Sequence, residues 1–185
     1  IFDRIFHIYF KMKYSFIYTR HISQFIKIMN ENNIALDEID RRILNALQVD
    51  ASQTNSELAQ AVHVSAPTCL RRVKHLRESG VIERQVAIVA PQLVGARLTA
   101  IVEITLDVQA AERMAEFEQL VADAPAVLQC YRVSPGPDFV LMVQVADMPA
   151  YHALAHRLFA AHANVRNVKS YFSTFRSKFE TRIAV

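Results

Sequence analysis

The feature that most constrains this sequence is a pair of helical patterns separated by a turn of only three residues. Thr54 and Glu57 have the spacing of a capping box, in which the hydroxyl accepts from a free backbone amide and the carboxylate reaches back to the helix start. After the turn at residues 63–65, Ser65 suits an N-cap, and Pro67 lies in a first helical turn where its missing N–H costs little. Helices of about eight and fourteen residues on either side of this turn would form a helix-turn-helix.

A further helix precedes this pair, and a strand follows it. Apolar residues recur at helical spacing before the pair, at Leu36, Ile39, Ile43, Leu44 and Leu47. Gly80 can supply the left-handed cap that ends the last helix. Residues 81–89 predict a strand, either the wing of a winged helix-turn-helix or a link to the next domain. The sequence therefore predicts a helix-turn-helix domain over residues 36–84.

The second helix of the pair carries a cluster of basic side chains, with no acid between residues 65 and 77. We expect Leu70, Val73 and Leu76 to face inward, which turns the N-terminal half of the helix outward. In a helix-turn-helix that half enters the major groove, where arginine reads guanine edges or holds phosphates. A solvated basic face is the simpler alternative, and the capped turn geometry favours DNA. The predicted DNA contacts are Asn55, Ser65, Ala66, Pro67, Thr68, Arg71, Arg72, Lys74 and His75.

The net charge of +3 says little about DNA, because the excess lies in the first part of the chain. Residues 1–35 hold five basic and two acidic side chains, and the remainder is balanced. Residues 1–34 contain no Ala, Gly or Pro, unlike the Ala-rich remainder. We therefore assign residues 1–35 to an N-terminal extension, and we expect the native start at Met29, with residues 1–28 non-native or disordered. A basic, aromatic arm that touches DNA or a membrane surface is the alternative.

Pro91 and Gly95 mark a boundary between a strand linker, residues 85–96, and a second domain, residues 97–185. Patterns in that domain predict a strand over 98–106, a helix over 109–122, strands over 127–133 and 138–145, a helix capped by Asp147, and a strand over 168–175. This βαββαβ order is ferredoxin-like, so the predicted fold class is α+β. An open four-stranded sheet with helices on one face leaves the other face uncovered, and we expect a homodimer to form through it.

The remaining composition argues against an enzyme. With three glycines in the chain, no dinucleotide motif G-x-G-x-x-G, no phosphate-loop motif G-x-x-x-x-G-K-[ST] and no G-x-S-x-G can be written. Cys69 and Cys130 stand alone, which fits a reducing, cytoplasmic setting rather than a disulfide framework. His152 and His156 have the i, i+4 spacing of two metal ligands, but no third ligand is evident. We therefore expect no catalytic residue, no metal and no cofactor.

Short motifs run in order through both domains. In the first they are Leu36–Leu44 (LDEIDRRIL), Glu57–Ala59 (ELA), Ser65–Leu76 (SAPTCLRRVKHL) and Gly80–Ile82 (GVI). In the second they are Val102–Leu106 (VEITL), Val133–Ser134, Asp138–Phe139 and Asp147–Tyr151 (DMPAY). Together, over residues 36–175, they resemble the Lrp/AsnC (leucine-responsive regulatory protein) family of bacterial and archaeal transcription regulators.

The resemblance implies a sequence-specific DNA-binding transcription regulator whose assembly or DNA affinity responds to a small amino acid, leucine or another apolar one. Residues 55–74 would be the helix-turn-helix, and the second domain would sense the amino acid. Homodimers, assembling to octamers, would bind this effector between dimers. The implied effector contacts are Gly136, Asp138, Met148, Tyr171, Phe172 and Ser173. Pro135 stands where the family usually has glycine and removes an N–H that a ligand could use, which leaves the effector open.

Two other functions stay open at this point. An architectural protein would wrap DNA with little effector response, and its binding would be nearly all phosphate electrostatics. A sirohaem decarboxylase-like enzyme resembles the same two-domain fold. It would need a tetrapyrrole pocket lined by several basic and histidine side chains, which the histidine positions do not suggest.

Overall fold

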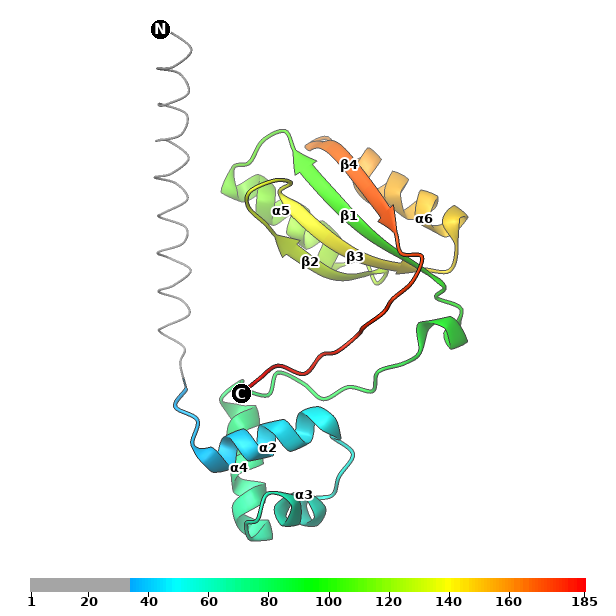
Figure 1. The fold of residues 1–185 in the computed structure, drawn as a ribbon. Helices are drawn as coiled ribbons and strands as arrows, with labels where there is room; N and C mark the ends of the chain where they lie inside the picture. Colours follow the sequence, from blue (N-terminus) through cyan, green and yellow to red (C-terminus); the bar gives the residue numbers. More distant parts are fainter. Residues whose placement is uncertain (1–33) are drawn as a thin grey trace, which may run out of the picture. The chain divides into compact units, whose positions relative to one another are not determined.

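The computed structural model describes residues 34–185, so Met29 and the extension before residue 34 lie outside the described residues. The described chain divides into two compact units (Figure 1). The first unit runs up to Gln85 and also contains the segment Thr181–Val185. The second unit spans Val86–Glu180. Residues 181–185, which the sequence assigns to the second domain, therefore belong to the first unit.

Three helices make up the described part of the first unit: α2 (Glu38–Val49), α3 (Asn55–Ala61) and α4 (Ala66–Glu78). The capping box of α3 is confirmed, since Thr54 accepts from the Glu57 amide and the Glu57 carboxylate accepts from the Thr54 amide. A second capping box, at Asp37 and Asp40, begins α2. The core between the helices consists of Ile43, Leu44, Leu58, Ala59, Val62, Cys69 and Leu76. The predicted helix-turn-helix is thus present.

The buried face of α4 differs from the prediction at one position. Leu70, expected to face inward, is 59% exposed. Cys69 and Leu76 are fully buried and Val73 is half-buried, so the buried stripe passes through Cys69 instead. Both stripes have helical spacing and both are apolar, so periodicity alone does not separate them. The result is a leucine that faces solvent on the second helix of the motif.

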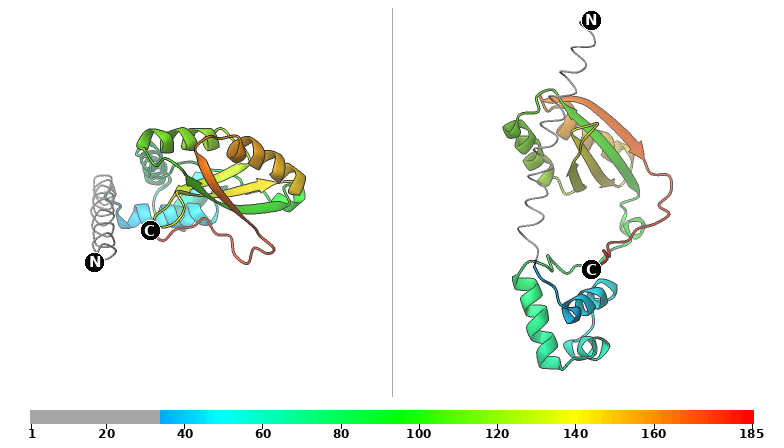
Figure 2. Two further views of the ribbon diagram at one scale, coloured as in Figure 1. Left: turned by 90° about the horizontal axis from the view of Figure 1, so that it is seen from above. Right: turned by 60° about the vertical axis from the view of Figure 1, so that its left-hand side comes forward.

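The second unit is a four-stranded antiparallel sheet in the order β2-β3-β1-β4. Its elements are β1 (Leu98–Leu106), α5 (Ala111–Ala122), β2 (Val127–Arg132), β3 (Phe139–Val145), α6 (Met148–Ala155) and β4 (Val165–Phe172). Both helices cover the same face of the sheet (Figure 2). The ferredoxin-like βαββαβ order predicted from the sequence is confirmed.

The two faces of this sheet differ in burial because side chains alternate along each strand. The helix-covered face holds the core, with residues such as Val102, Ile104 and Leu141 fully buried. On the opposite face, Ile101 lies across from Met142 on β3 and from Tyr171 on β4. No helix or strand of the second unit covers this opposite face, which we call the open face. The open face is apolar along the row of Met142, Ile101 and Tyr171 and more polar around that row.

Two predicted strands differ from the structure. Residues 81–89, predicted as a strand, form none, although Val86, Ile88 and Val89 are exposed apolar side chains. A strand needs a neighbouring edge for its hydrogen bonds, and this segment has none among the described residues. The last strand is Val165–Phe172 rather than residues 168–175, because it pairs with β1 in that register. A short 3-10 helix, η1 (Pro91–Val94), and a π-helix, η2 (His156–Ala160), were not predicted.

The segment Thr181–Val185 closes the first unit from far along the chain. The side-chain amide of Gln48 donates to the Ile183 carbonyl at 3.1 Å and accepts from the Ile183 N–H at 2.8 Å. The Gln48 side chain therefore bonds both backbone polar groups of Ile183, as a residue of a neighbouring strand would. Val185 packs against the helical core. The first unit is thus built from two stretches of sequence.

Candidate functional site

The exposed face of α4 gathers the basic side chains of the first unit. Pro67, Leu70, Arg71 and Lys74 are all exposed and lie at helical spacing on one stripe. The Lys74 ammonium lies 3.7 Å from the Glu78 carboxylate, in an exposed i, i+4 pair. His75 and Arg77 are also exposed beside this stripe. We call this surface, residues 65–77 facing solvent, the basic face of α4.

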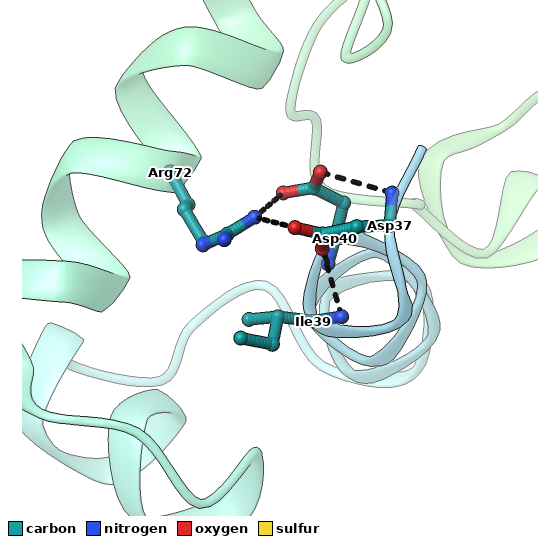
Figure 3. A network of polar contacts seen from close by, with 4 residues as sticks. All are labelled: Asp37, Ile39, Asp40 and Arg72. Carbon is teal, nitrogen blue, oxygen red and sulfur yellow. Dashed lines mark hydrogen bonds and ion pairs between the residues drawn. The ribbon is translucent and has the colours of Figure 1, made fainter. Parts of the chain in front are cut away.

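Arg72 leaves this face, although the sequence analysis places it among the DNA contacts. Its Nη1 donates to Asp37 Oδ2 at 2.6 Å and to Asp40 Oδ1 at 2.9 Å, and its side chain is only 20% exposed (Figure 3). The hydrogen bonds to Asp40 and Asp37 raise the pKa of Arg72. The hydrogen bond from the Asp40 amide lowers the pKa of Asp37, and the hydrogen bond from Arg72 lowers it further. Arg72 therefore joins α4 to the start of α2.

Sequence reasoning missed the two aspartates of this network. The available signal was the spacing of Asp37 and Asp40, which is that of a capping residue and its partner three positions later. Their link to Arg72 spans more than thirty positions and follows only from the packing of the helices.

Asn55 also has a partner inside the unit. Its Nδ2 donates to the Ala66 carbonyl at 2.9 Å, which ties the first residue of α3 to the first residue of α4. The Ser65 hydroxyl donates to Thr68 Oγ1 at 2.8 Å and makes no cap to a backbone amide. Five of the nine predicted contacts face solvent: Ser65, Pro67, Arg71, Lys74 and His75. Ala66 and Thr68 are half-buried. Asn55 and Arg72 bond within the unit.

In the second unit, two of the predicted effector contacts share one cleft. Met148 and Phe172 line an open cleft of about 750 Å³ between α6, η2 and β4. The Tyr151 hydroxyl and Ser170 Oγ form a hydrogen bond within the cleft. The ring of Tyr151 stands edge-on to that of Phe172, with centroids 5.0 Å apart. These contacts fix the cleft wall and leave its mouth open.

Asp138 has an internal role. It is buried, and its carboxylate accepts from the Leu106 amide at 2.6 Å. Its own amide donates to the Ile104 carbonyl at 2.8 Å, and its carbonyl accepts from the Val133 amide at 3.1 Å. Asp138 therefore joins the β2–β3 hairpin to the end of β1, whereas the exposed Gly136 stays free of this network in the hairpin turn at φ +123°.

The predicted effector contacts lie at opposite ends of β1. The Asp138 amide donates to the Ile104 carbonyl, whereas the Ser173 amide donates to the Thr99 carbonyl at 2.9 Å. Five residues of strand separate these ends, which is roughly 17 Å. Tyr171 points to the open face and Phe172 to the helix-covered face, since neighbouring residues of a strand alternate. One copy of the chain does not bring the six residues together.

The described residues contain neither a metal-binding cluster nor a membrane-spanning helix. No group of three or more His, Cys, Asp or Glu side chains in residues 34–185 is placed to hold a metal ion. Within the same part of the chain, no helix is long and apolar enough to cross a membrane. His152 and His156 instead lie along the cleft beside α6.

Comparison with known proteins places both units. Residues 99–183 match the family described as the Lrp/AsnC ligand binding domain. Residues 36–83 match the family described as winged helix-turn-helix DNA-binding. The two matches follow each other along the chain in the order of the two units.

Similar proteins carry regulatory names. The chain is 39% identical over 137 residues to an uncharacterised HTH-type transcriptional regulator of Haemophilus influenzae, covering 74% of this chain and 82% of that one. It is 33% identical to the DNA-binding transcriptional activator DecR of Escherichia coli, covering 81% and 99%. A solved structure of a transcriptional regulator from Neisseria meningitidis in complex with L-Met is 29% identical, with a TM-score of 0.76 over 80% of this chain and 96% of that one.

We predict unequal effects on stability for substitutions of the two adjacent arginines of α4. Arg72→Ala leaves the buried Asp40 without its cation and is expected to lower the free energy of unfolding by about 1–3 kcal/mol. Arg71→Ala, at an exposed position, is expected to change it by less than about 0.5 kcal/mol. Urea unfolding monitored by circular dichroism measures both. Equal stability of the two variants would contradict the network.

The stability loss in Arg72→Ala should depend on pH. Because the pKa of Asp37 is lowered from its ordinary value of 3.8, the ionised carboxylate stabilises the fold above that pH. This contribution is lost as the pH falls below 3.8 through the lowered folded value. The stability difference between wild type and Arg72→Ala should therefore shrink in that acidic range, and a constant difference would count against the ion pair.

We predict that the main role of Asp138 is to stabilise the fold and not to contact a ligand. Asp138→Ala removes the acceptor of the buried Leu106 amide and should cost about 1–3 kcal/mol of stability. Asp138→Asn retains an acceptor oxygen and should cost less. The exposed neighbour Asp107 provides the control, because Asp107→Ala should be nearly neutral. An Asp138→Ala protein of wild-type thermal stability would return this residue to the effector site.

Proposed function

Because the chain belongs to the Lrp/AsnC family of DNA-binding transcription regulators, we propose that it recognises particular duplex sequences through α4 and responds to a small amino acid. The observation that carries the DNA part is the basic face of α4. It presents Arg71 and Lys74 to solvent on the helix that follows the tight turn. Acidic side chains are absent from residues 65–77, so the face attracts a polyanion along its whole length.

The parts of the motif have different tasks in this proposal. The N-terminal half of α4 enters the major groove, as second helices of this motif do. Arg71 carries a planar fork that fits the O6 and N7 acceptors of guanine, and Lys74 suits a phosphate. Arg72 and Asn55 make no DNA contact here. They hold α4 against α2 and α3, so that the reading side chains keep one orientation.

We propose that two copies associate through the open face of the sheet. Ile101 is 37% exposed and Tyr171 is 49% exposed on this face, next to the half-buried Met142. An uncovered sheet face of this kind is stabilised when a second copy packs on it. A two-fold dimer then presents two copies of α4 to half-sites about one helical turn, or a multiple of it, apart.

We propose an amino acid as the effector, bound where copies meet. The family match describes a ligand-binding domain, and the Neisseria regulator was solved with L-Met. The separation of Asp138 from Ser173 along β1 favours a site that a further copy completes. Gly136, Met148, Tyr171, Phe172 and Ser173 remain the proposed contacts, and Asp138 shapes the hairpin that carries Gly136. Binding at such a site shifts the balance between dimers and larger assemblies, octamers among them, with different DNA affinity.

The first prediction from this proposal concerns DNA binding. The protein should shift a duplex from its own upstream region at fixed salt, and one amino acid of a tested panel should change that shift. Arg71→Ala should weaken specific binding by about 1–3 kcal/mol if it reads a base edge. Arg113→Ala, an exposed arginine of α5, is the matched control and should bind as wild type.

The outcomes of this experiment separate the functions. A specific shift that no amino acid changes would contradict the sensing part alone. Binding of equal strength to all duplexes, with a steep salt dependence, would favour an architectural protein. Wild-type affinity of Arg71→Ala would contradict the proposed orientation of α4.

The second prediction concerns assembly. Met142→Lys places a charge in the apolar row of the open face and should weaken the dimer by at least about tenfold, because like charges then meet across the interface. Val108→Lys adds the same charge at an exposed position after β1 and should leave the mass unchanged. Sedimentation velocity measures the mass of each variant. A Met142→Lys protein that stays dimeric with wild-type affinity would exclude this face.

A further inference from the structure

One large apolar side chain stands in the middle of the basic face of α4. Leu70 is 59% exposed, while its neighbour Cys69 is completely buried. The helix cannot turn Leu70 inward, because Cys69, Leu76 and the ion-paired Arg72 already hold the opposite side against α2 and α3. Leu70 is therefore presented to solvent by the packing of the unit.

The surroundings of Leu70 indicate what it contacts. Pro67 and Lys74 flank it at i−3 and i+4, and Arg71 follows it directly, all of them exposed. The nearest acid along the helix, Glu78, is paired with Lys74. A contact surface for an apolar protein patch would rarely carry cations such as Arg71 and Lys74 directly beside its leucine, whereas a nucleic-acid groove combines phosphates at its rim with base edges at its floor.

We propose that Leu70 is a specificity-determining residue that contacts the C5-methyl group of thymine in the major groove. This inference rests on the DNA recognition proposed above and adds the base that α4 selects. Thymine carries the apolar group that the standard bases offer at the major-groove edge. Leu70 lies at the fifth residue of α4, which begins at Ala66, within the half of the helix that enters the groove.

The division of labour on α4 then follows from the chemistry of its side chains. Arg71 and Lys74 contact phosphate or guanine acceptors and set the depth of the helix in the groove. Leu70, between them, removes its own apolar surface and a methyl group from water together. Uracil presents the same hydrogen-bonding groups as thymine but lacks the methyl group. Replacing thymine by uracil therefore removes the methyl contact and leaves every polar contact in place.

The test uses a duplex enriched from a random pool by the wild-type protein. Each thymine of the enriched site is replaced by deoxyuridine in turn, and affinity is measured at constant salt. For wild type, at least one replacement per half-site should weaken binding about fourfold, the effect of burying one methyl group. Leu70→Ala should bind the thymine duplex more weakly and lose the difference between thymine and uracil. Leu70→Met keeps an apolar contact and should retain the difference.

Two controls make the result decisive. Leu93→Ala is the same substitution at a leucine that is 87% exposed outside α4, and it should keep the wild-type preference. Leu70→Ala should melt at the wild-type temperature, since it removes no buried contact. A preference for thymine that survives in Leu70→Ala, or that wild type lacks at all positions, overturns the inference.

The failure of this inference differs from that of the proposed function. Enrichment of a sequence whose binding ignores the methyl groups overturns only the role of Leu70. Failure to enrich any sequence overturns the proposed recognition and the role of Leu70 with it. A Leu70→Ala protein with altered mass and an unchanged thymine preference would assign the leucine to contact with a second copy.

Discussion

The ion pairs between Arg72 and the two aspartates at the start of α2 fix the orientation of α4 within the first unit. They join α4 to α2 on the side opposite the basic face, where Cys69 and Leu76 also pack. A buried charge that loses its partner is costly, so this contact tolerates only one rotation of α4 about its axis. That rotation decides which side chains of α4 face solvent and which serve the fold, as the exposed Arg71 and the ion-paired Arg72 show.

Local patterns predicted most of the elements, because their causes lie within a few residues. The capping box at Thr54 and Glu57 and the cap at Asp147 are examples, and both are present. Features that depend on distant partners escaped prediction. The partners of Arg72, the register of β4 on β1 and the burial of Cys69 in preference to Leu70 are decided by packing between elements. The same limit applies to the site, where charge clustering indicated α4 but not which of its residues face solvent.

The second unit separates its tasks between the two faces and two ends of one sheet. The helix-covered face is filled by its own core, and the cleft between α6 and β4 is shaped by the contact of Tyr151 with Ser170 and Phe172. The open face has no cover within the described residues, and the candidate effector contacts are divided between the ends of β1. Under the proposed function, association would complete the effector site, and assembly and ligand binding would then be parts of one equilibrium.

The pairing of Gln48 with Ile183 makes the DNA-binding unit discontinuous along the chain. During synthesis, a ribosome releases α2, α3 and α4 well before the segment that closes them, with the 95 residues of Val86–Glu180 in between. Domains tend to fold as they emerge. The helical unit is therefore completed only after the sheet has been synthesised, so translation order links completion of the first unit to prior synthesis of the second.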